Sequence, residues 1–289
     1  MKAIFRCDAS PDIGTGHVTR CLTLADALAE QGWDCAFCVS PETLATMPNL
    51  ADTPYPRISP DDTPGRCDWL IVDHYGLDAG YERDARQWAE HILVIDDLAD
   101  RSHDCDVLVD QTLGRDASDY RDLVPGHCKI LTGTDYAILR PQFAQMRESA
   151  LKRREARQGK IERVLVSLGR TNINNVTGFV LQALHDFEDT ALHIDVVLGG
   201  TAQYLDDVRD KIDMLNVKTP HSVTLHLDSD TMAEMMCTAD LAIGAGGTTS
   251  WERCCLGLPT LLIVLADYQQ KISHQLHENG AAINLGVLD

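Results

Sequence analysis

The chain has 289 residues, which is enough for two domains of ordinary size, and its 44% hydrophobic and 24% charged residues are typical of globular domains. This composition excludes a largely disordered chain. The formal net charge of −19 excludes nucleic acid and anionic membrane surfaces as ligands attracted by overall charge. An anionic ligand therefore has to find local donors, such as helix N-termini and single arginines.

The cysteines and the lack of targeting signals favour a cytoplasmic protein with no membrane partner. The ten cysteines are scattered, the N-terminal residues are typical of a strand, and no apolar run approaches the roughly 18 residues of a membrane span. We therefore expect reduced thiols. Cys35 and Cys38 form the only CxxC, but positions i and i+3 of a strand point to opposite faces, which favours packing over a metal or redox site.

Short apolar runs alternate with longer amphipathic segments in the first half of the chain. The clearest helix covers residues 17–31, where Leu22, Ala25 and Leu28 recur at helical spacing. Residues 69–73 (WLIVD) are an apolar run that ends in a charge, as in a strand buried on both faces. The predicted strands are 3–7, 35–40, 69–73, 92–95 and 107–109, and the predicted helices are 17–31 and 80–89.

The second half repeats this alternation after a polar, locally basic segment, residues 146–160, which we interpret as a partly helical, solvated connection between the domains. The pattern predicts an α/β protein of two Rossmann-like domains with parallel sheets, residues 1–145 and 161–289, and a ligand in the cleft between them. The predicted strands of the second domain are 163–167, 193–198, 222–227, 241–244 and 259–264, and its predicted helices are 176–185, 204–215, 231–238 and 250–257.

The first candidate site is the loop that opens the first helix. Gly14 and Gly16 allow the backbone to approach a ligand closely, but Thr19 stands where a dinucleotide fingerprint needs its third glycine. His17 falls in the first turn, where the positive end of the helix disfavours a charged imidazole. A neutral imidazole at the edge of a cleft is suited to act as a general base. The alternative is a histidine that only packs or caps the helix.

The second candidate site is another turn between a strand and a helix. Gly246, Gly247 and Thr248 offer N–H groups and a hydroxyl that suit a diphosphate. Thr249 and Glu252 have the spacing of a capping box, which competes with a ligand-binding role for Glu252. Residues 167–172 follow the strand 163–167, and their polar side chains predict either sugar or phosphate binding or an Asx-type turn.

Several characteristic blocks occur in order along nearly the whole chain: residues 6–8 (RCD), 13–25 (IGTGHVTRCLTLA), 71–75 (IVDHY), 136–143 (YAILRPQF), 245–252 (AGGTTSWE), 259–260 (PT) and 266–269 (ADYQ). Together they resemble one family, the UDP-2,4-diacetamido-2,4,6-trideoxy-β-L-altropyranose hydrolases of pseudaminic acid biosynthesis. The blocks 245–252 and 259–260 also resemble the wider glycosyltransferase-B superfamily, including the MurG-type transferases.

The resemblance implies metal-independent, inverting hydrolysis of the sugar C1–O bond, with a UDP-sugar as the binding partner and no cofactor. His17 matches the family's GTGH histidine, which implies that it is the base activating water. The diphosphate would lie on residues 246–248 and the ribose on Glu252. The other residues implied to bind substrate, several on the sugar side, are Arg6, Asp8, Gly14, Gly16, Asp73, Tyr75, Ser167 and Gln269. A cleft formed by the chain's own domains also favours a monomer.

The sequence departs from the family pattern at three places. Arg170 replaces a glycine, and Tyr268 replaces an asparagine. The sequence ends at Asp289, without the helices that return to the first domain in this superfamily, so we expect a shortened second domain. His274 and His277 are spaced i, i+3 on an expected helix, and we expect no metal site there.

Hydrolysis of a related nucleotide sugar is one alternative, and three other functions compete with hydrolysis. A glycosyltransferase would use the same nucleotide-sugar site with a bound acceptor in place of water. A non-catalytic protein would bind UDP without turnover. A dehydrogenase would bind NAD, which the missing third glycine disfavours.

Overall fold

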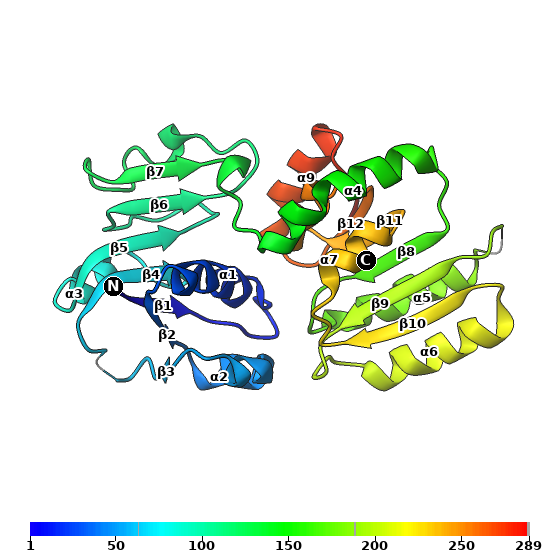
Figure 1. The fold of residues 1–289 in the computed structure, drawn as a ribbon, viewed down its shortest axis with the longest axis horizontal. Coiled ribbons are helices and arrows are strands. Elements are labelled where there is room, and N and C mark those ends of the chain that lie inside the picture. Colours follow the sequence, from blue (N-terminus) through cyan, green and yellow to red (C-terminus); the bar gives the residue numbers. More distant parts are fainter. Residues whose placement is uncertain (63, 188, 288–289) are drawn as a thin grey trace. The chain divides into compact units, whose positions relative to one another are not determined.

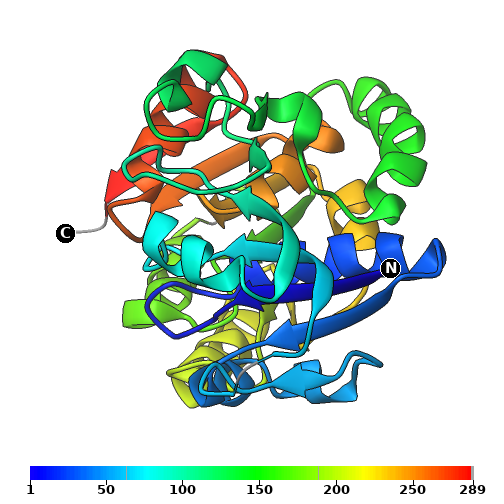
Figure 2. The ribbon, with the colours of Figure 1, turned by 90° about the vertical axis from the view of Figure 1, so that its left-hand side faces the viewer.

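The computed structural model describes residues 1–62, 64–187 and 189–287 and divides the chain into two units, Met1–Ile138 and Leu139–Asp289. Residues 288–289, the end of the predicted second domain, lie outside the described residues. Each unit is a parallel sheet with helices, as predicted. The ribbon can be followed from the blue N-terminus to the red C-terminal segment in Figure 1 and, turned by 90°, in Figure 2.

The first unit contains a 7-stranded sheet in the order β3-β2-β1-β4-β5-β6-β7, with parallel pairing throughout. Its strands are β1 (Lys2–Cys7), β2 (Asp34–Cys38), β3 (Arg57–Ile58), β4 (Cys67–Asp73), β5 (Ala89–Ile95), β6 (Val107–Asp110) and β7 (Lys129–Thr132). Its helices are α1 (Gly16–Glu30), α2 (Pro41–Thr46) and α3 (Ala79–Ala85), with 3₁₀ turns η1 (Pro48–Asp52), η2 (Ala117–Tyr120) and η3 (Thr134–Tyr136).

Successive side chains of a strand point to opposite faces of a sheet, and the core of the first unit follows this rule. Phe5 of β1 packs on one face with Val18 of α1, while Ile4 packs on the other face with Ala85 of α3. Burial on both faces therefore explains why the central strands β1 and β4 are largely apolar. This arrangement fixes α1 against the sheet.

The second unit contains a 6-stranded parallel sheet in the order β10-β9-β8-β11-β12-β13. Its strands are β8 (Arg163–Ser167), β9 (His193–Leu198), β10 (Ser222–Leu227), β11 (Leu241–Ala245), β12 (Thr260–Val264) and β13 (Ile283–Val287). Its helices are α4 (Pro141–Arg157), α5 (Val176–His185), α6 (Leu205–Lys218), α7 (Met232–Thr238), α8 (Thr249–Cys255) and α9 (Gln269–Glu278), with the 3₁₀ turn η4 (Ile173–Asn175).

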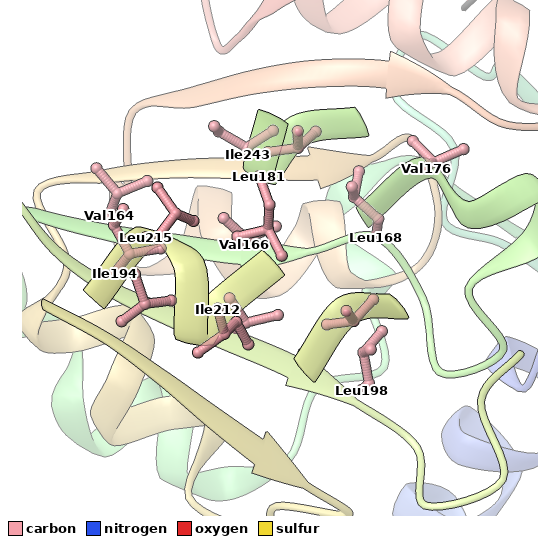
Figure 3. Close-up of a cluster of buried hydrophobic side chains, with 14 of the residues drawn as sticks. Val164, Val166, Leu168, Val176, Leu181, Ile194, Leu198, Ile212, Leu215 and Ile243 are labelled. Carbon is pink, nitrogen blue, oxygen red and sulfur yellow. The ribbon is translucent and has the colours of Figure 1, made fainter. Parts of the chain in front are cut away.

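Two buried clusters cover the two faces of this second sheet. In the cluster drawn in Figure 3, Val164 and Val166 of β8 pack with Leu181 of α5 and Ile212 of α6. Leu165, between the two valines, points to the opposite face and packs in the cluster formed by α4, α7 and α8. Helices on both faces therefore hold the sheet whose strands lead into the second candidate loop.

The segment expected to be the connection between domains is largely helical. Residues 146–157 belong to α4, whose Phe143 and Ala150 have no exposed surface and pack in the core of the second unit. The division falls after Ile138 rather than at residue 145. The polar composition suggested a solvated segment, but polar side chains of this helix also bind within the unit. Arg154, for example, donates hydrogen bonds to four backbone carbonyls of the same unit.

Among the helices of the described residues, none is long and apolar enough to span a lipid bilayer.

Candidate functional site

His17 and Asp73 meet at the carboxyl edge of the first sheet. The register of β1 with β4 pairs Cys7 with Asp73, so the loop after β1 and the end of β4 reach the same edge. Nδ1 of His17 lies 2.7 Å from Oδ1 of Asp73 and 3.1 Å from its backbone oxygen. Arg20, one turn further along α1, donates from Nε and Nη2 to the same carboxylate at 2.5 and 2.6 Å. The three side chains form one buried group.

The charges of this group set the pKa of His17. Burial lowers it, but the charge of Asp73 and its hydrogen bond to the ring outweigh burial, so the pKa of His17 is raised. We expected the helix N-terminus to disfavour the charged ring, but the pKa of His17 moves in the opposite direction because of Asp73, which lies 56 residues away in the sequence. The pKa of Asp73 is held well below its usual range, since Arg20 and His17 outweigh the effect of burial.

Two more side chains complete this edge of the site. The ring of Tyr75 meets that of His17 edge to face, with centroids 4.4 Å apart. Oδ2 of Asp97 accepts hydrogen bonds from Arg20 at 3.2 Å and from the Tyr75 hydroxyl at 3.4 Å. Burial raises the pKa of Asp97. Neither Arg20 nor Asp97 was predicted as a site residue, although the aspartates directly after the predicted strand 92–95 were a usable signal.

Arg6 and Asp8 form a second polar group on the neighbouring strand end. Nη1 of Arg6 lies 2.9 Å from Oδ2 of Asp8, which also accepts from Nε2 of His74 at 3.2 Å. Oδ1 of Asp8 accepts from the Ser40 N–H at 2.7 Å and the Thr43 hydroxyl at 2.9 Å. Burial alone would raise the pKa of Asp8, but these hydrogen bonds and Arg6 hold it well below its usual range. Asp8 is thus an ionised carboxylate on the same edge as Asp73.

The glycines of the first loop shape the approach to α1. Gly14 has a φ of +74°, a conformation that favours glycine, and its N–H donates to Ser10 at 2.9 Å. No atom lies within 4 Å of a Cβ built at Gly14, so this side of the loop is open. Gly16 is the first residue of α1. The loop therefore presents bare backbone directly before His17.

In the second unit, the candidate loop follows β11 and leads into α8. A Cβ built at Gly246 would collide with the hydroxyl of buried Ser273, whereas one built at Gly247 would meet nothing within 4 Å. Gly246 is therefore packed closely against Ser273, while Gly247 faces open space. Thr248 precedes the first residue of α8.

Glu252 does not take part in the capping box that its spacing suggested. The residue before α8 is Thr248 rather than Thr249, and no side chain caps the helix. Oε1 of Glu252 instead accepts from Nη2 of Arg140 at 3.2 Å. Burial raises the pKa of Glu252 despite the charge of Arg140. The capping alternative is thereby removed.

Ser167, Gln269 and Arg170 are the remaining residues of the second unit that the sequence singled out, and each has a different contact. Ser167 ends β8 and pairs in register with Gly244, just before the loop. Oε1 of Gln269 accepts from the Leu265 N–H at 3.0 Å, so this side chain holds its own segment together. Arg170, which replaces a family glycine, forms an ion pair with Asp228.

The described residues contain no group of three or more His, Cys, Asp or Glu side chains that could hold a metal ion. Cys35 and Cys38 are both buried free thiols. Of the predicted residues in the first unit, His17 contacts Asp73 and Tyr75, and Arg6 contacts Asp8. Asp73 was expected to line the sugar side, but its carboxylate has no exposed surface and is held by Arg20 and His17.

Comparison with proteins of known sequence supports the resemblance. No protein-family model matches the chain. It is 27% identical over 248 residues to the UDP-2,4-diacetamido-2,4,6-trideoxy-β-L-altropyranose hydrolase of Campylobacter jejuni, covering 82% of this chain and 81% of that protein. It is 30% identical over 168 residues to the spore coat polysaccharide biosynthesis protein SpsG of Bacillus subtilis, covering 58% of this chain and 47% of that protein.

An uncharacterized protein of Methanocaldococcus jannaschii is 24% identical over 290 residues, covering 96% of this chain. This chain spans 58% of the length of that relative and 47% of the Bacillus protein. Both relatives are therefore much longer than the region that is similar to this chain.

Solved structures show the same fold. The MurG structure of Acinetobacter baumannii matches 99% of this chain and 86% of its own, with a TM-score of 0.66 and 16% identity. The UDP-GlcNAc 2-epimerase structure of Methanocaldococcus jannaschii matches 99% and 89%, with a TM-score of 0.53 and 15% identity. The chain thus has the glycosyltransferase-B fold of two Rossmann-like domains, and its resemblance to the UDP-2,4-diacetamido-2,4,6-trideoxy-β-L-altropyranose hydrolases is confirmed.

Proposed function

We propose that this chain hydrolyses UDP-2,4-diacetamido-2,4,6-trideoxy-β-L-altropyranose to UDP and the free sugar, with His17 as the general base. The single observation that carries the proposal is the hydrogen-bonded pair of His17 and Asp73, in a chain 27% identical to the Campylobacter hydrolase of that name. The resemblance also implies that the reaction needs no metal ion or other cofactor.

The orientation of His17 suits it for taking a proton from water. Asp73 accepts the hydrogen on Nδ1, which places the lone pair of the neutral ring on Nε2. Among the described residues, only Nδ1 of this ring is hydrogen-bonded. Nε2 takes the proton as the water oxygen bonds to C1 of the sugar. The C1–O bond breaks, its electron pair leaves with UDP, and the configuration at C1 is inverted.

The polar residues of the first unit would bind the sugar. Arg6 and Asp8 would hydrogen-bond its polar groups, and Tyr75 would lie against it beside His17. Bare backbone at Gly14 and Gly16 would allow the substrate to approach the base closely. Asp73, which has no exposed surface, is assigned to positioning His17 rather than to contact with the sugar.

The loop of the second unit would bind UDP. Gly246, Gly247 and Thr248 would hold the diphosphate, and the open space at Gly247 leaves room for it. Glu252 would accept hydrogen bonds from the ribose hydroxyls. Ser167, at the end of the neighbouring strand β8, would contribute its hydroxyl, and Gln269 would support the loop from behind.

The test is the release of UDP from this nucleotide sugar, followed with time-resolved NMR to identify the anomer formed first. Wild type should release UDP and form the inverted anomer, at a rate unchanged by a metal chelator. His17→Ala should be slower by about 100-fold or more, because general-base catalysis is lost. Equal rates in the two proteins would disprove the role of His17. Retention of configuration would disprove direct attack by water.

The alternative function is transfer of a sugar from a UDP-sugar to an acceptor, which the fold shared with MurG over 99% of this chain also allows. A fold likeness at 16% identity does not choose between water and another acceptor. Wild-type protein that binds UDP but releases none from the sugar nucleotide until an acceptor is added would support the transferase. Binding of UDP without turnover under either condition would support a binding protein.

A further inference from the structure

Arg253 is a buried cation beneath the candidate diphosphate loop. Its side chain is among the largest in the protein with almost no exposed surface. Nη2 donates to the Ala245 carbonyl at 2.6 Å and to the Ser250 hydroxyl at 3.0 Å, and Nη1 donates to the Thr249 hydroxyl at 3.2 Å. These acceptors lie on both sides of residues 246–248, so the guanidinium ties the two ends of the loop together.

All of these acceptors are neutral. No described carboxylate lies within 4.0 Å of the Arg253 guanidinium. The charge of the adjacent Glu252 acts on Arg253 without forming an ion pair, and Glu252 is itself paired with Arg140. Arg20, the other deeply buried arginine of a candidate site, has Asp73 as its counter-charge. Burial lowers the pKa of Arg253 to about 10, so the side chain still carries its charge at neutral pH. A buried charge without a counter-charge destabilises the folded protein.

The neighbouring strand is shaped around this cation. A Cβ built at Gly244 of β11 would collide with Nη1 of Arg253. Glycine at position 244 therefore leaves the space that the guanidinium occupies at the carboxyl end of the strand. The protein thus buries a charge that lowers its stability, and it leaves space for that charge at Gly244. Both features lie next to the loop that has open space at Gly247, which suggests that the charge serves a ligand on this loop.

We propose that Arg253 is a positioning residue for a bound diphosphate: it fixes the loop 245–250 and supplies the positive charge that an anionic ligand on this loop neutralises. The inference rests on the proposed function only in taking this loop as the diphosphate site. Because little water screens a buried charge, its effect on binding increases with the negative charge of the ligand. Among the described residues no carboxylate forms an ion pair with this guanidinium, and the bound diphosphate provides a closer counter-charge.

The test compares ligands that differ in charge. Isothermal titration calorimetry of UDP, UMP and uridine should show that Arg253→Gln weakens UDP binding by about tenfold or more, weakens UMP binding less, and changes uridine binding by less than about twofold. Arg253→Lys keeps the charge and should keep most of the UDP-to-uridine ratio. Equal losses for all three ligands in Arg253→Gln would overturn the proposal, because they would indicate a purely structural role.

Arg154 offers a matched control. It is a partly buried arginine of the same unit that also donates only to neutral carbonyls, among them those of Ala239 and Gly257. These residues precede β11 and β12, so Arg154 lies at the opposite edge of the sheet from the loop. Arg154→Gln should lower the thermal midpoint without changing the UDP-to-uridine ratio. An equal change of the ratio in this variant would also overturn the proposal.

Further outcomes separate this inference from the proposed function. If Arg253→Gln fails to fold by circular dichroism, the Arg253→Lys ratio decides: a folded lysine variant that loses the preference for UDP overturns the proposal. Wild type that binds UDP but cleaves no sugar nucleotide contradicts the proposed reaction and leaves the ligand series to decide on Arg253. If wild type binds ADP more tightly than UDP, the ratio of ADP to adenosine affinity replaces the ratio of UDP to uridine affinity in this test. Wild type without any preference for a nucleoside diphosphate overturns both.

Discussion

Nδ1 of His17 lies 2.7 Å from Oδ1 of Asp73, and the same carboxylate receives two hydrogen bonds from Arg20. The pair fixes the tautomer and direction of the imidazole, as a buried aspartate does in other histidine bases. Arg20 has a second effect, because its charge keeps Asp73 ionised although this carboxylate has no exposed surface. The three residues therefore depend on one another, and removal of each should give a different defect.

Asp73→Asn should reduce kcat by about 1,000-fold or more while the protein stays folded, because an amide no longer selects the tautomer with its lone pair on Nε2. UDP release under saturating substrate measures the loss. Asp110→Asn is a matched control, since Asp110 is equally buried and paired with Arg115 in the same unit. It should lose stability with little change in kcat. Similar losses of kcat in both variants would mean that Asp73 acts only by stabilising the fold.

Arg20→Met should lower the free energy of unfolding by about 3–5 kcal/mol, because it leaves the carboxylate of Asp73 buried without its cation. Urea unfolding of the whole chain measures this. Lys152→Met removes an ion pair with Glu148 in which both side chains are mostly exposed, and should change the free energy by less than about 1 kcal/mol. A small loss of unfolding free energy in Arg20→Met would show that water or His17 compensates the negative charge of Asp73.

The two glycines of the second loop should respond differently to alanine. Gly246→Ala should destabilise the protein by about 1–3 kcal/mol, because its methyl group would collide with the Ser273 hydroxyl. Gly247→Ala has free space and should leave the thermal midpoint nearly unchanged while weakening UDP binding, since the methyl group would occupy the ligand's space. Unchanged UDP affinity in Gly247→Ala would remove the loop from the proposed diphosphate site.

The sequence was sufficient to predict the two parallel α/β units and the two glycine loops. Uniformly apolar runs such as residues 69–73 can only be buried on both faces, and their alternation with amphipathic segments specifies crossover helices. The short outer strands β3, β7 and β13 were not predicted. Two residues of β3, or the half-exposed residues of β13, provide too little hydrophobic pattern.

Side-chain partners were harder to predict than elements. Arg20 and Asp73 are 53 residues apart, and only the register of β1 with β4 brings them together. The spacing of Thr249 and Glu252 matched a capping box, but a distant arginine, Arg140, takes the carboxylate. Local patterns do not reveal such pairs because their partners come from other elements.

The pH dependence of activity and of stability should have opposite signs around His17. Its pKa is raised above the ordinary value of 6.5, and the base is active only when deprotonated. As pH falls, kcat/KM should therefore decrease, with a midpoint above 6.5. A raised pKa also means that the folded protein binds this proton more tightly than the unfolded chain does. The resulting stabilisation is fully present below 6.5 and is lost as pH rises through the folded-state pKa.

Between these two pKa values, activity should rise while the His17 contribution to stability falls. Profiles of kcat/KM and of the urea midpoint from about pH 5.5 to about pH 9 measure both effects. His17→Gln should remove this component from the stability profile, and Asp73→Asn should move the kcat/KM midpoint to lower pH, because the charge that raises the pKa of His17 is gone. A wild-type midpoint below 6.5 would contradict the raised pKa and would mean that burial, rather than Asp73, dominates the ionisation of the base.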